Sequence, residues 1–303
     1  MKKIVRLATF MLLILRRGKF QHSGYDYQQI RREMLSDVIQ FCPGLSGLDA
    51  QRPLWNWKIF RNPYVKGWIA HAAFLKNALK AKAGHLSVPA LNLSYIRNPK
   101  AASTALCFTM LLARFAELKK YTPTAETINY LADVNLQKES ASINADESFF
   151  TVVRNPFLRI VAVYREFFEQ QRVHFIYDDY LFGIVSKDLS FKEFVKLLQL
   201  IPESLKDQHL KSQNSLLRFY RGKDIDLNIF KLEEPAALNL FLSGYGLSLD
   251  VLNKSVTPYD YRKYYDRETL AIVYNVYSQD VSLFRYEGVY LELAQFVKNL
   301  VPG

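Results

Sequence analysis

The chain has 303 residues, of which 50% are hydrophobic and 23% are charged. This length suits one large α/β domain or two small ones, with enough apolar residues for a sizeable core. The two cysteines, Cys42 and Cys107, are far apart, which argues against a disulfide framework and favours a reducing compartment. The net charge is +11, but six basic residues without an acid stand in the first nineteen positions. The remaining excess is too small for a duplex-binding stripe, so we expect anionic ligands and no nucleic acid.

Residues 1–20 contain a short apolar run with basic residues on both sides. The run is shorter than the roughly 20 residues that a membrane span requires, and it lacks a small-residue cleavage site. It is therefore either an amphipathic helix resting on an anionic membrane surface or a helix docked on the domain. We expect residues 1–88 to form a helical N-terminal extension packed on a core domain of residues 89–303.

Residues 91–115 predict a buried strand, a tight polar turn and a long helix. Asn98 and Pro99 end the strand, and apolar residues recur at helical spacing from Ala101 onward. A helix begins with unpaired N–H groups and the positive end of its dipole, so a lysine and hydroxyl groups there suit a bound phosphate or sulfate. The residues of this kind in the turn are Lys100, Ser103 and Thr104.

Residues 148–168 repeat the same strand, turn and helix. Arg154 stands where the strand ends. In open α/β sheets the carboxyl ends of the strands form the ligand-binding edge, so Arg154 is placed to bind a ligand there. Its planar guanidinium donates two parallel hydrogen bonds, as a phosphate requires.

With these two segments the sequence resembles the carbohydrate sulfotransferases that use 3′-phosphoadenosine 5′-phosphosulfate (PAPS), the family of chondroitin, dermatan and heparan sulfate enzymes. The resemblance rests on the strings PKAAST and VVRNPFLRIVAVYR and continues in the same order to Tyr286. It implies an α/β fold like that of a P-loop kinase, with three layers and a mostly parallel open sheet flanked by helices. Residues 89–303 would be the sulfotransferase domain.

The resemblance also implies which residues hold PAPS, the cosubstrate. The turn after the first strand would bind the 5′-phosphosulfate and the end of the second strand the 3′-phosphate. One position departs from the family: Ala162 stands where a serine usually contacts the 3′-phosphate. The implied cofactor-binding residues are Lys100, Ala101, Ala102, Ser103, Thr104 and Arg154.

Catalysis of sulfuryl transfer requires stabilisation of the leaving phosphate and a base for the acceptor hydroxyl. Lys100 is placed for the first task, and we expect no metal. His209 is a candidate base, because it and Gln213 match an HxxxQ-like segment of the family, and we expect both on one face of a short helical stretch. Glu233 matches an acidic family position and either binds the acceptor, orients its neighbours or is an exposed glutamate without a function. Four further carboxylates remain candidates for the base: Glu126, Asp133, Glu139 and Glu147.

We therefore expect a PAPS-dependent sulfotransferase that acts on a hydroxyl of a carbohydrate or glycan acceptor. A nucleotide-dependent kinase is the alternative enzyme, although the sequence has no glycine-rich loop or paired Mg²⁺-binding acids. The non-enzymatic alternative is a basic peripheral membrane-binding protein. We expect a cytoplasmic location, with contact to the inner face of the membrane through residues 1–20, or the Golgi lumen for a eukaryotic source. Asn253–Ser255 resembles a loop that closes over the 3′-phosphate.

Overall fold

The structure is a computed structural model. It describes residues 84–120, 123–139, 143–144, 146–169, 184–185, 188–249 and 259–299. The predicted helical extension, apart from its last five residues, and the predicted closing loop at Asn253–Ser255 lie outside the described residues. No helix in the described part of the chain is both long enough and apolar enough to cross a membrane.

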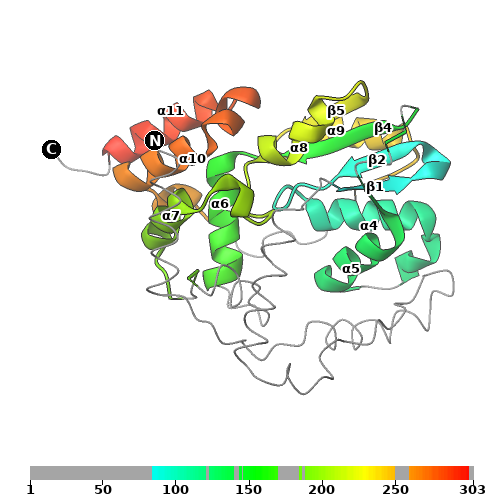
Figure 1. Ribbon diagram of the computed structural model, residues 1–303, viewed down its shortest axis with the longest axis horizontal. Helices are drawn as coiled ribbons and strands as arrows, with labels where there is room; N and C mark the ends of the chain where they lie inside the picture. The colour runs from blue at the N-terminus through cyan, green and yellow to red at the C-terminus, as the bar shows by residue number, and fades with distance from the viewer. Residues whose placement is uncertain are drawn as a thin grey trace, which may run out of the picture.

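A five-stranded sheet in the order β3-β1-β2-β4-β5 forms the centre of the fold (Figure 1). β2 pairs with β4 and β4 with β5 in parallel, whereas β1 pairs with both β2 and β3 in antiparallel register. Among the described strands, β1 alone runs against the others, so the prediction of a mostly parallel sheet is confirmed. The strands are β1 (Gly84–Val88), β2 (Leu93–Ile96), β3 (Gln137–Glu139), β4 (Ser148–Val153) and β5 (Asp226–Lys231).

Helices cover both faces of this sheet, as predicted for the three-layer α/β class. They are α4 (Ser103–Arg114), α5 (Ala125–Leu136), α6 (Pro156–Tyr164), α7 (Phe191–Leu200), α8 (Gln213–Arg221), α9 (Pro235–Ser243), α10 (Arg267–Leu283) and α11 (Glu287–Asn299). The helix α6 runs on into a π-helical turn, Arg165–Glu169, which shifts the phase of the side chains that follow.

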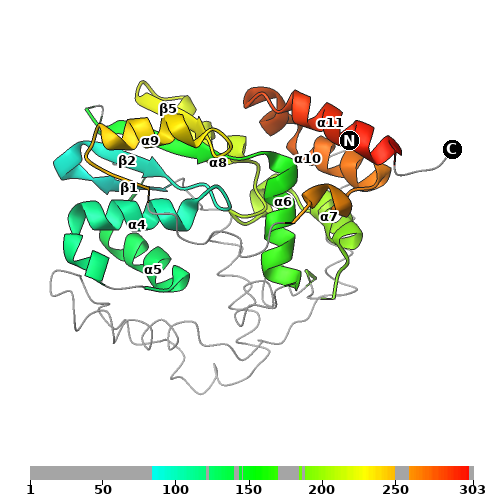
Figure 2. The same cartoon turned by 180° about the vertical axis from the view of Figure 1, so that it is seen from behind.

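The alternation of side chains along the strands divides the interior into two cores. Tyr95 and Phe150 point to one side, where α4, α5 and α9 pack. Ile96 and Phe149 point to the other side, toward the core that contains α6, α7, α8, α10 and α11. Figure 2 shows α9 in front of the strands, and Figure 1 shows α8 from the opposite side. Both strand ends that carry candidate site residues are therefore enclosed by packed helices.

Local signals in the sequence account for most helix starts. Ser190 and Glu193 form a capping box at the start of α7, and Asp266 caps α10. The side chain of Asn155 accepts hydrogen bonds from the first turn of α6, with Pro156 at its first position. These residues fix the start of α6, so that only Arg154 and Asn155 lie between the end of β4 and the helix.

Three predicted details differ in the structure. Leu91 lies in a short 3₁₀ turn, because Asn92 adopts a left-handed conformation that ends this turn before β2 begins. The sheet starts earlier than expected, with β1 at Gly84. His209 and Gln213 do not share a helix face, since Asp207 caps a separate turn around His209 and the helix α8 begins only at Gln213.

Candidate active site

The loop between β2 and α4 has a constrained backbone at the predicted anion site. Lys100 has φ 68° and Ala102 has φ 58°, both in the left-handed region. This conformation costs a non-glycine residue about 1–2 kcal/mol, so the surrounding contacts must hold it in place. Asn98 is one such contact: it is fully buried, and its Nδ2 donates to the carbonyl of Val152 at 2.8 Å. The loop is thereby tied to the end of β4.

The first turn of α4 is free of side-chain caps. Its N-cap residue is Ala102, which has no side chain able to accept from the backbone, and the first turn carries no acidic residue. The helices α5, α6, α7, α8 and α10 all have a capping side chain. A helix start without such a cap retains donors and a positive dipole end for an anion. The hydroxyl of Thr104 accepts from Nδ2 of Asn129 at 3.5 Å, which orients this side chain toward α5.

Arg154 reaches this loop directly from the end of β4. Its Nη1 donates to the carbonyl oxygen of Lys100 at 3.0 Å. Burial lowers the pKa of Arg154, while the nearby Tyr259 and Glu233 act in the opposite direction. The guanidinium stays charged, because an arginine pKa lies far above neutrality. The two predicted anion-binding residues thus lie side by side at one edge of the sheet.

Gln213 fixes the backbone of Arg154. Its Oε1 accepts from the Arg154 N–H at 2.8 Å and from Nδ2 of Asn98 at 2.8 Å, and its Nε2 donates to the Arg154 carbonyl at 2.7 Å. The side-chain amide therefore extends β4 by one paired residue. Asp280 positions Gln213 in turn, by accepting from the N–H groups of Gln213 and Asn214 at 2.8 Å each. Burial raises the pKa of Asp280 to about 6, although the two backbone donors lower it.

We expect Gln213→Ala to destabilise the protein and weaken its anion site together. The change removes three hydrogen bonds and leaves the Arg154 backbone groups buried without partners, which costs about 2–4 kcal/mol in the free energy of unfolding. Denaturant unfolding measures the loss. Gln208→Ala is the control, since this exposed side chain lies in the neighbouring turn. Equal stability of the two variants would contradict the role of Gln213.

A second tether is Arg159, whose side chain is only 1% exposed. It donates to three backbone carbonyls: Nε to Pro99 at 3.0 Å, Nη1 to Lys211 at 2.9 Å and Nη2 to Gln208 at 3.1 Å. Pro99 precedes Lys100, and Gln208 and Lys211 surround His209. One guanidinium on α6 therefore holds the anion loop and the turn with the candidate base in fixed relation.

The side chain of Lys100 points toward the π-helical turn. Its Nζ forms an ion pair with the carboxylate of Glu166 and lies 4.9 Å from the ring centroid of Phe167. The ring of His209 packs edge-on against the same Phe167, at 5.2 Å between centroids, and its Nδ1 lies 3.3 Å from Oδ1 of Asp207. The structure thus gathers Lys100, Glu166 and His209 around one aromatic ring.

The carboxylates considered as bases from the sequence have other positions. Glu147 is buried at the start of β4, where it accepts from the hydroxyls of Ser87 at 3.1 Å and Ser94 at 2.5 Å. That is the opposite strand end from Arg154. Asp133 pairs with Arg97 at 2.7 Å. The side chains of the two remaining candidates, Glu126 and Glu139, lie outside the described residues.

Glu233 orients neighbours rather than standing alone. Its Oε1 accepts from the N–H of Asn155 at 2.8 Å, and its Oε2 accepts from the hydroxyl of Tyr286 at 2.8 Å. It therefore links the segment after β5 to the residue that follows Arg154 and to the start of α11. Of the two roles that the sequence left open for Glu233, these contacts provide the orienting one.

Two other features bear on the site. Within the described ranges no group of His, Cys, Asp and Glu side chains is arranged to hold a metal ion.

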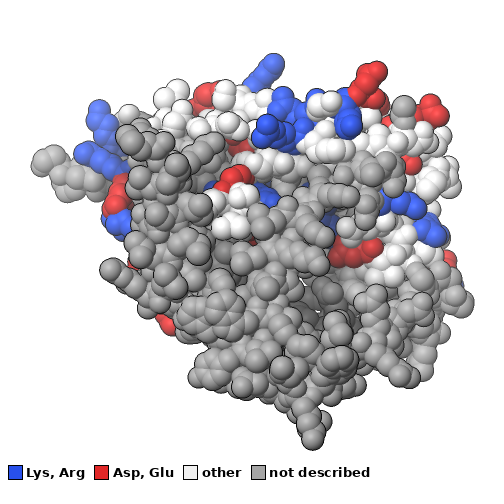
Figure 3. All heavy atoms as spheres, in the orientation of Figure 1, with Lys and Arg blue, Asp and Glu red and all other residues white. Residues whose placement is uncertain are grey.

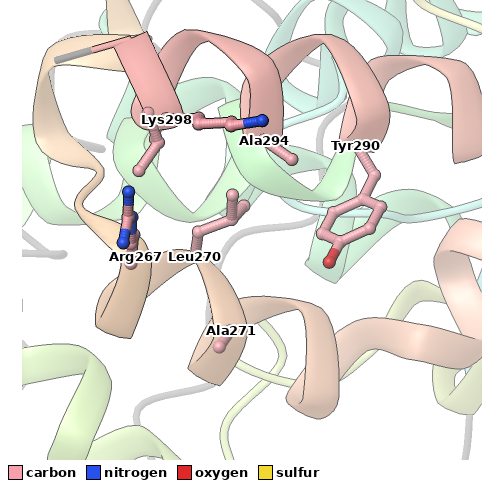
Figure 4. A pocket seen from close by; sticks show the side chains of 7 residues that line it. Arg267, Leu270, Ala271, Tyr290, Ala294 and Lys298 are labelled. Atoms are coloured by element: carbon pink, nitrogen blue, oxygen red, sulfur yellow. The ribbon is translucent and has the colours of Figure 1, made fainter. Parts of the chain in front are cut away.

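A separate surface hollow between α10 and α11 is lined by residues that include Arg267, Leu270, Tyr290 and Lys298 (Figure 4). None of the residues around Lys100 lines it.

The geometry defines an α/β protein in which the predicted anion-binding loop, with its uncapped helix start and Lys100, lies beside Arg154 at the carboxyl ends of two parallel strands. In a comparison with protein-family models, the model described as "Sulfotransferase family" matches residues 87–287. Because this match covers well over half of the chain, the protein belongs to the sulfotransferase family. The predicted family is therefore confirmed, and the protein is a transferase of sulfuryl groups. No curated protein and no solved structure matched the chain.

Proposed function

We propose that this sulfotransferase takes its sulfuryl group from PAPS and transfers it to a hydroxyl of a carbohydrate acceptor. The observation that carries the proposal is the contact between Arg154 and Lys100, since it joins the ends of β4 and β2 into one anion site. A donor with phosphate groups at both ends requires two such cationic groups close together. The carbohydrate acceptor is inferred from the sequence resemblance.

In this proposal the loop after β2 and Arg154 bind different groups of the donor. Lys100, together with the backbone of Ala101 and Ala102 and the first turn of α4 with Ser103 and Thr104, binds the 5′-phosphosulfate. Arg154 binds the 3′-phosphate with its guanidinium. As the S–O bond breaks, negative charge grows on the bridging oxygen, and the ammonium of Lys100 stabilises it. The hydroxyl of the acceptor passes its proton to a base, for which His209 and the carboxylate beside Lys100 are the candidates.

The two alternative functions make different demands on the site. A kinase would bind its nucleotide together with Mg²⁺, which is held by one or two acidic side chains and the nucleotide phosphates. A membrane-binding protein without catalysis would need a basic surface. The described part of the face in Figure 3 carries both basic and acidic side chains around α8 and β5. Contact of residues 1–20 with a membrane remains part of our proposal and is tested by vesicle binding.

Calorimetry with 3′-phosphoadenosine 5′-phosphate (PAP) and with ATP tests the donor part of the proposal. We expect PAP to bind and ATP to bind far more weakly. A preference for ATP would favour the kinase, and a failure to bind either would favour the surface-binding protein. Transfer of radiolabelled sulfate from PAPS onto a panel of desulfated glycosaminoglycans and bacterial polysaccharides then tests the acceptor. A panel in which no glycan is labelled would contradict the carbohydrate part.

Ala162 allows a gain-of-function test of the 3′-phosphate site. It lies in α6, on the helix that starts beside Arg154. We expect Ala162→Ser to tighten PAP binding about threefold to tenfold, because a hydroxyl there adds one hydrogen bond to a charged phosphate. Adenosine 5′-monophosphate lacks this phosphate and serves as the control ligand. An equal gain for both ligands, or none for PAP, would place the 3′-phosphate elsewhere.

A further inference from the structure

We propose that Glu166 is the general base that takes the proton from the acceptor hydroxyl. The inference rests on the proposed function, because it concerns the acceptor side of the same transfer. Glu166 was not a candidate from the sequence. It becomes one because its carboxylate is ion-paired with Lys100, the residue assigned to the leaving phosphate.

The position of Glu166 satisfies the geometric requirement for a base. In the transfer the attacking oxygen, the sulfur and the leaving oxygen lie roughly in line, so the base stands across the sulfuryl group from the leaving oxygen and both belong to one small site. Glu166 belongs to that site, because its carboxylate pairs with the Lys100 ammonium before the donor binds. The side chain of Glu166 is 32% exposed and that of Lys100 is 12% exposed, so the carboxylate lies on the more open side of the pair. An acceptor that arrives from solvent can therefore reach it.

The surroundings hold Glu166 in this position. It belongs to the π-helical turn after α6, and the next residue, Phe167, is buried against both Lys100 and His209. Since α6 begins beside Arg154, one continuous element connects the proposed 3′-phosphate site to the proposed base. The apolar ring beside the ion pair also limits water around the charges, which strengthens their interaction.

The transfer step balances with Glu166 as the base. The acceptor oxygen forms a bond to sulfur, and the bond between sulfur and the bridging phosphate oxygen breaks with its electron pair going to that oxygen. The hydroxyl proton passes to the Glu166 carboxylate, and the leaving phosphate is stabilised by Lys100. When the donor binds, Lys100 turns from Glu166 to the phosphosulfate. A carboxylate that loses a neighbouring ammonium accepts a proton more readily, so donor binding itself prepares the base.

The other nearby candidate has a different arrangement. His209 lies with Nδ1 3.3 Å from Oδ1 of Asp207, and its ring rests on Phe167. Its turn is held by Arg159 through the carbonyls of Gln208 and Lys211. These contacts suit a group that shapes the acceptor side of the site. We therefore expect His209→Gln to lower turnover less than Glu166→Gln does.

The test compares Glu166→Gln with Glu169→Gln. Both changes remove one negative charge from the same π-helical turn without altering the shape of the side chain. Sulfate transfer is measured from PAPS to the glycan labelled in the acceptor screen and, as a second reaction, to water. The affinity for PAP is measured by calorimetry on the same samples, and thermal unfolding checks that each variant is folded. We expect Glu166→Gln to lower turnover by about 10²–10³-fold, with PAP affinity equal to or tighter than that of the wild type. Glu169→Gln should stay within about twofold in both measurements.

Three results would overturn the assignment. Turnover of Glu166→Gln within about threefold of the wild type would exclude Glu166 as the base. A parallel loss of turnover and PAP affinity would make it a residue that shapes the donor loop. A larger loss with His209→Gln than with Glu166→Gln would assign the base to His209. If the wild-type protein neither binds PAP nor cleaves PAPS, the proposed function fails first and this inference falls with it.

Discussion

Lys100→Ala is expected to lower the turnover of sulfate transfer by about 10²–10³-fold, the usual effect of removing one preorganised group that stabilises transition-state charge. The ammonium stands close to this position, because the Lys100 backbone is held by Arg154 and its side chain lies beside Phe167 and, before the donor binds, pairs with Glu166. Alanine tolerates the left-handed backbone about as well as lysine does, so the fold should remain. We expect the free energy of unfolding to change by about 1 kcal/mol or less, since a partly exposed ion pair contributes little.

The variant Lys196→Ala is a matched control for Lys100→Ala. Lys196 pairs with Glu268 on the surface of α7. Its replacement by alanine also removes one positive charge, but at a position that is distant in sequence from Lys100. A double variant, Lys100→Ala with Glu166→Gln, separates two causes of the loss. It removes the repulsion between an unpaired Glu166 and the donor, so it should bind PAP more tightly than Lys100→Ala alone without regaining turnover. Turnover of Lys100→Ala within a few-fold of the wild type would refute the role of Lys100.

The second large effect is expected for Arg154→Ala, in affinity rather than in turnover at saturating donor. Hydrogen bonds to charged groups are worth about 1.5–3 kcal/mol each, so the loss of even one of the two bonds should weaken PAP binding about tenfold to a hundredfold. The measurement is a calorimetric titration. Arg154→Lys should recover only part of the loss, because an ammonium keeps the charge but not the two parallel donors.

Adenosine 5′-monophosphate separates a direct role of Arg154 from an indirect one. Its 5′-phosphate binds only the Lys100 loop in our account. Arg154 also donates to the Lys100 carbonyl, so its loss perturbs this loop to some degree. A loss of affinity that is equal for both nucleotides would mean that Arg154 acts only by holding the loop. An unchanged PAP affinity would remove the assignment altogether.

The elements that carry the site could be predicted because their signals are local. The strand before Arg154 is a run of apolar residues, and the turn at Asn155–Pro156 both ends it and caps α6. Ser190 and Glu193 likewise match the S-x-x-E pattern of a capping box, which is a local signal for the start of α7. Cys107 lies within the apolar pattern after the anion loop, and it is fully buried in α4.

Other features could not be predicted because they arise from tertiary contacts. The strand β3, Gln137–Glu139, is short and polar, and it exists because β1 offers it a partner. The strand β1 contains glycine, histidine and serine, which do not form an apolar run, yet pairing with β2 and β3 on its two sides and burial of its side chains stabilise it. The turn around His209 was expected to be helical, but the side chain of Asp207 closes it before α8 starts.

The pairing of Glu166 with Lys100 is the most important feature that the sequence did not reveal. A regular continuation of α6 would give each later side chain a direction set by a period of 3.6 residues. The π-helical turn changes that phase from Arg165 onward, so the direction of Glu166 could not be derived from the helical pattern. Its partner is 66 residues earlier in the chain, and only the packing of α6 beside the loop brings them together.

The central claim is that Lys100 and Arg154 bind the two ends of one donor molecule. A crystal structure of the protein with PAP tests it most directly. We predict that the 5′-phosphate lies on the first turn of α4 beside Lys100 and that the 3′-phosphate accepts hydrogen bonds from Arg154. A nucleotide bound elsewhere, or one whose 3′-phosphate has no contact with Arg154, would contradict the account.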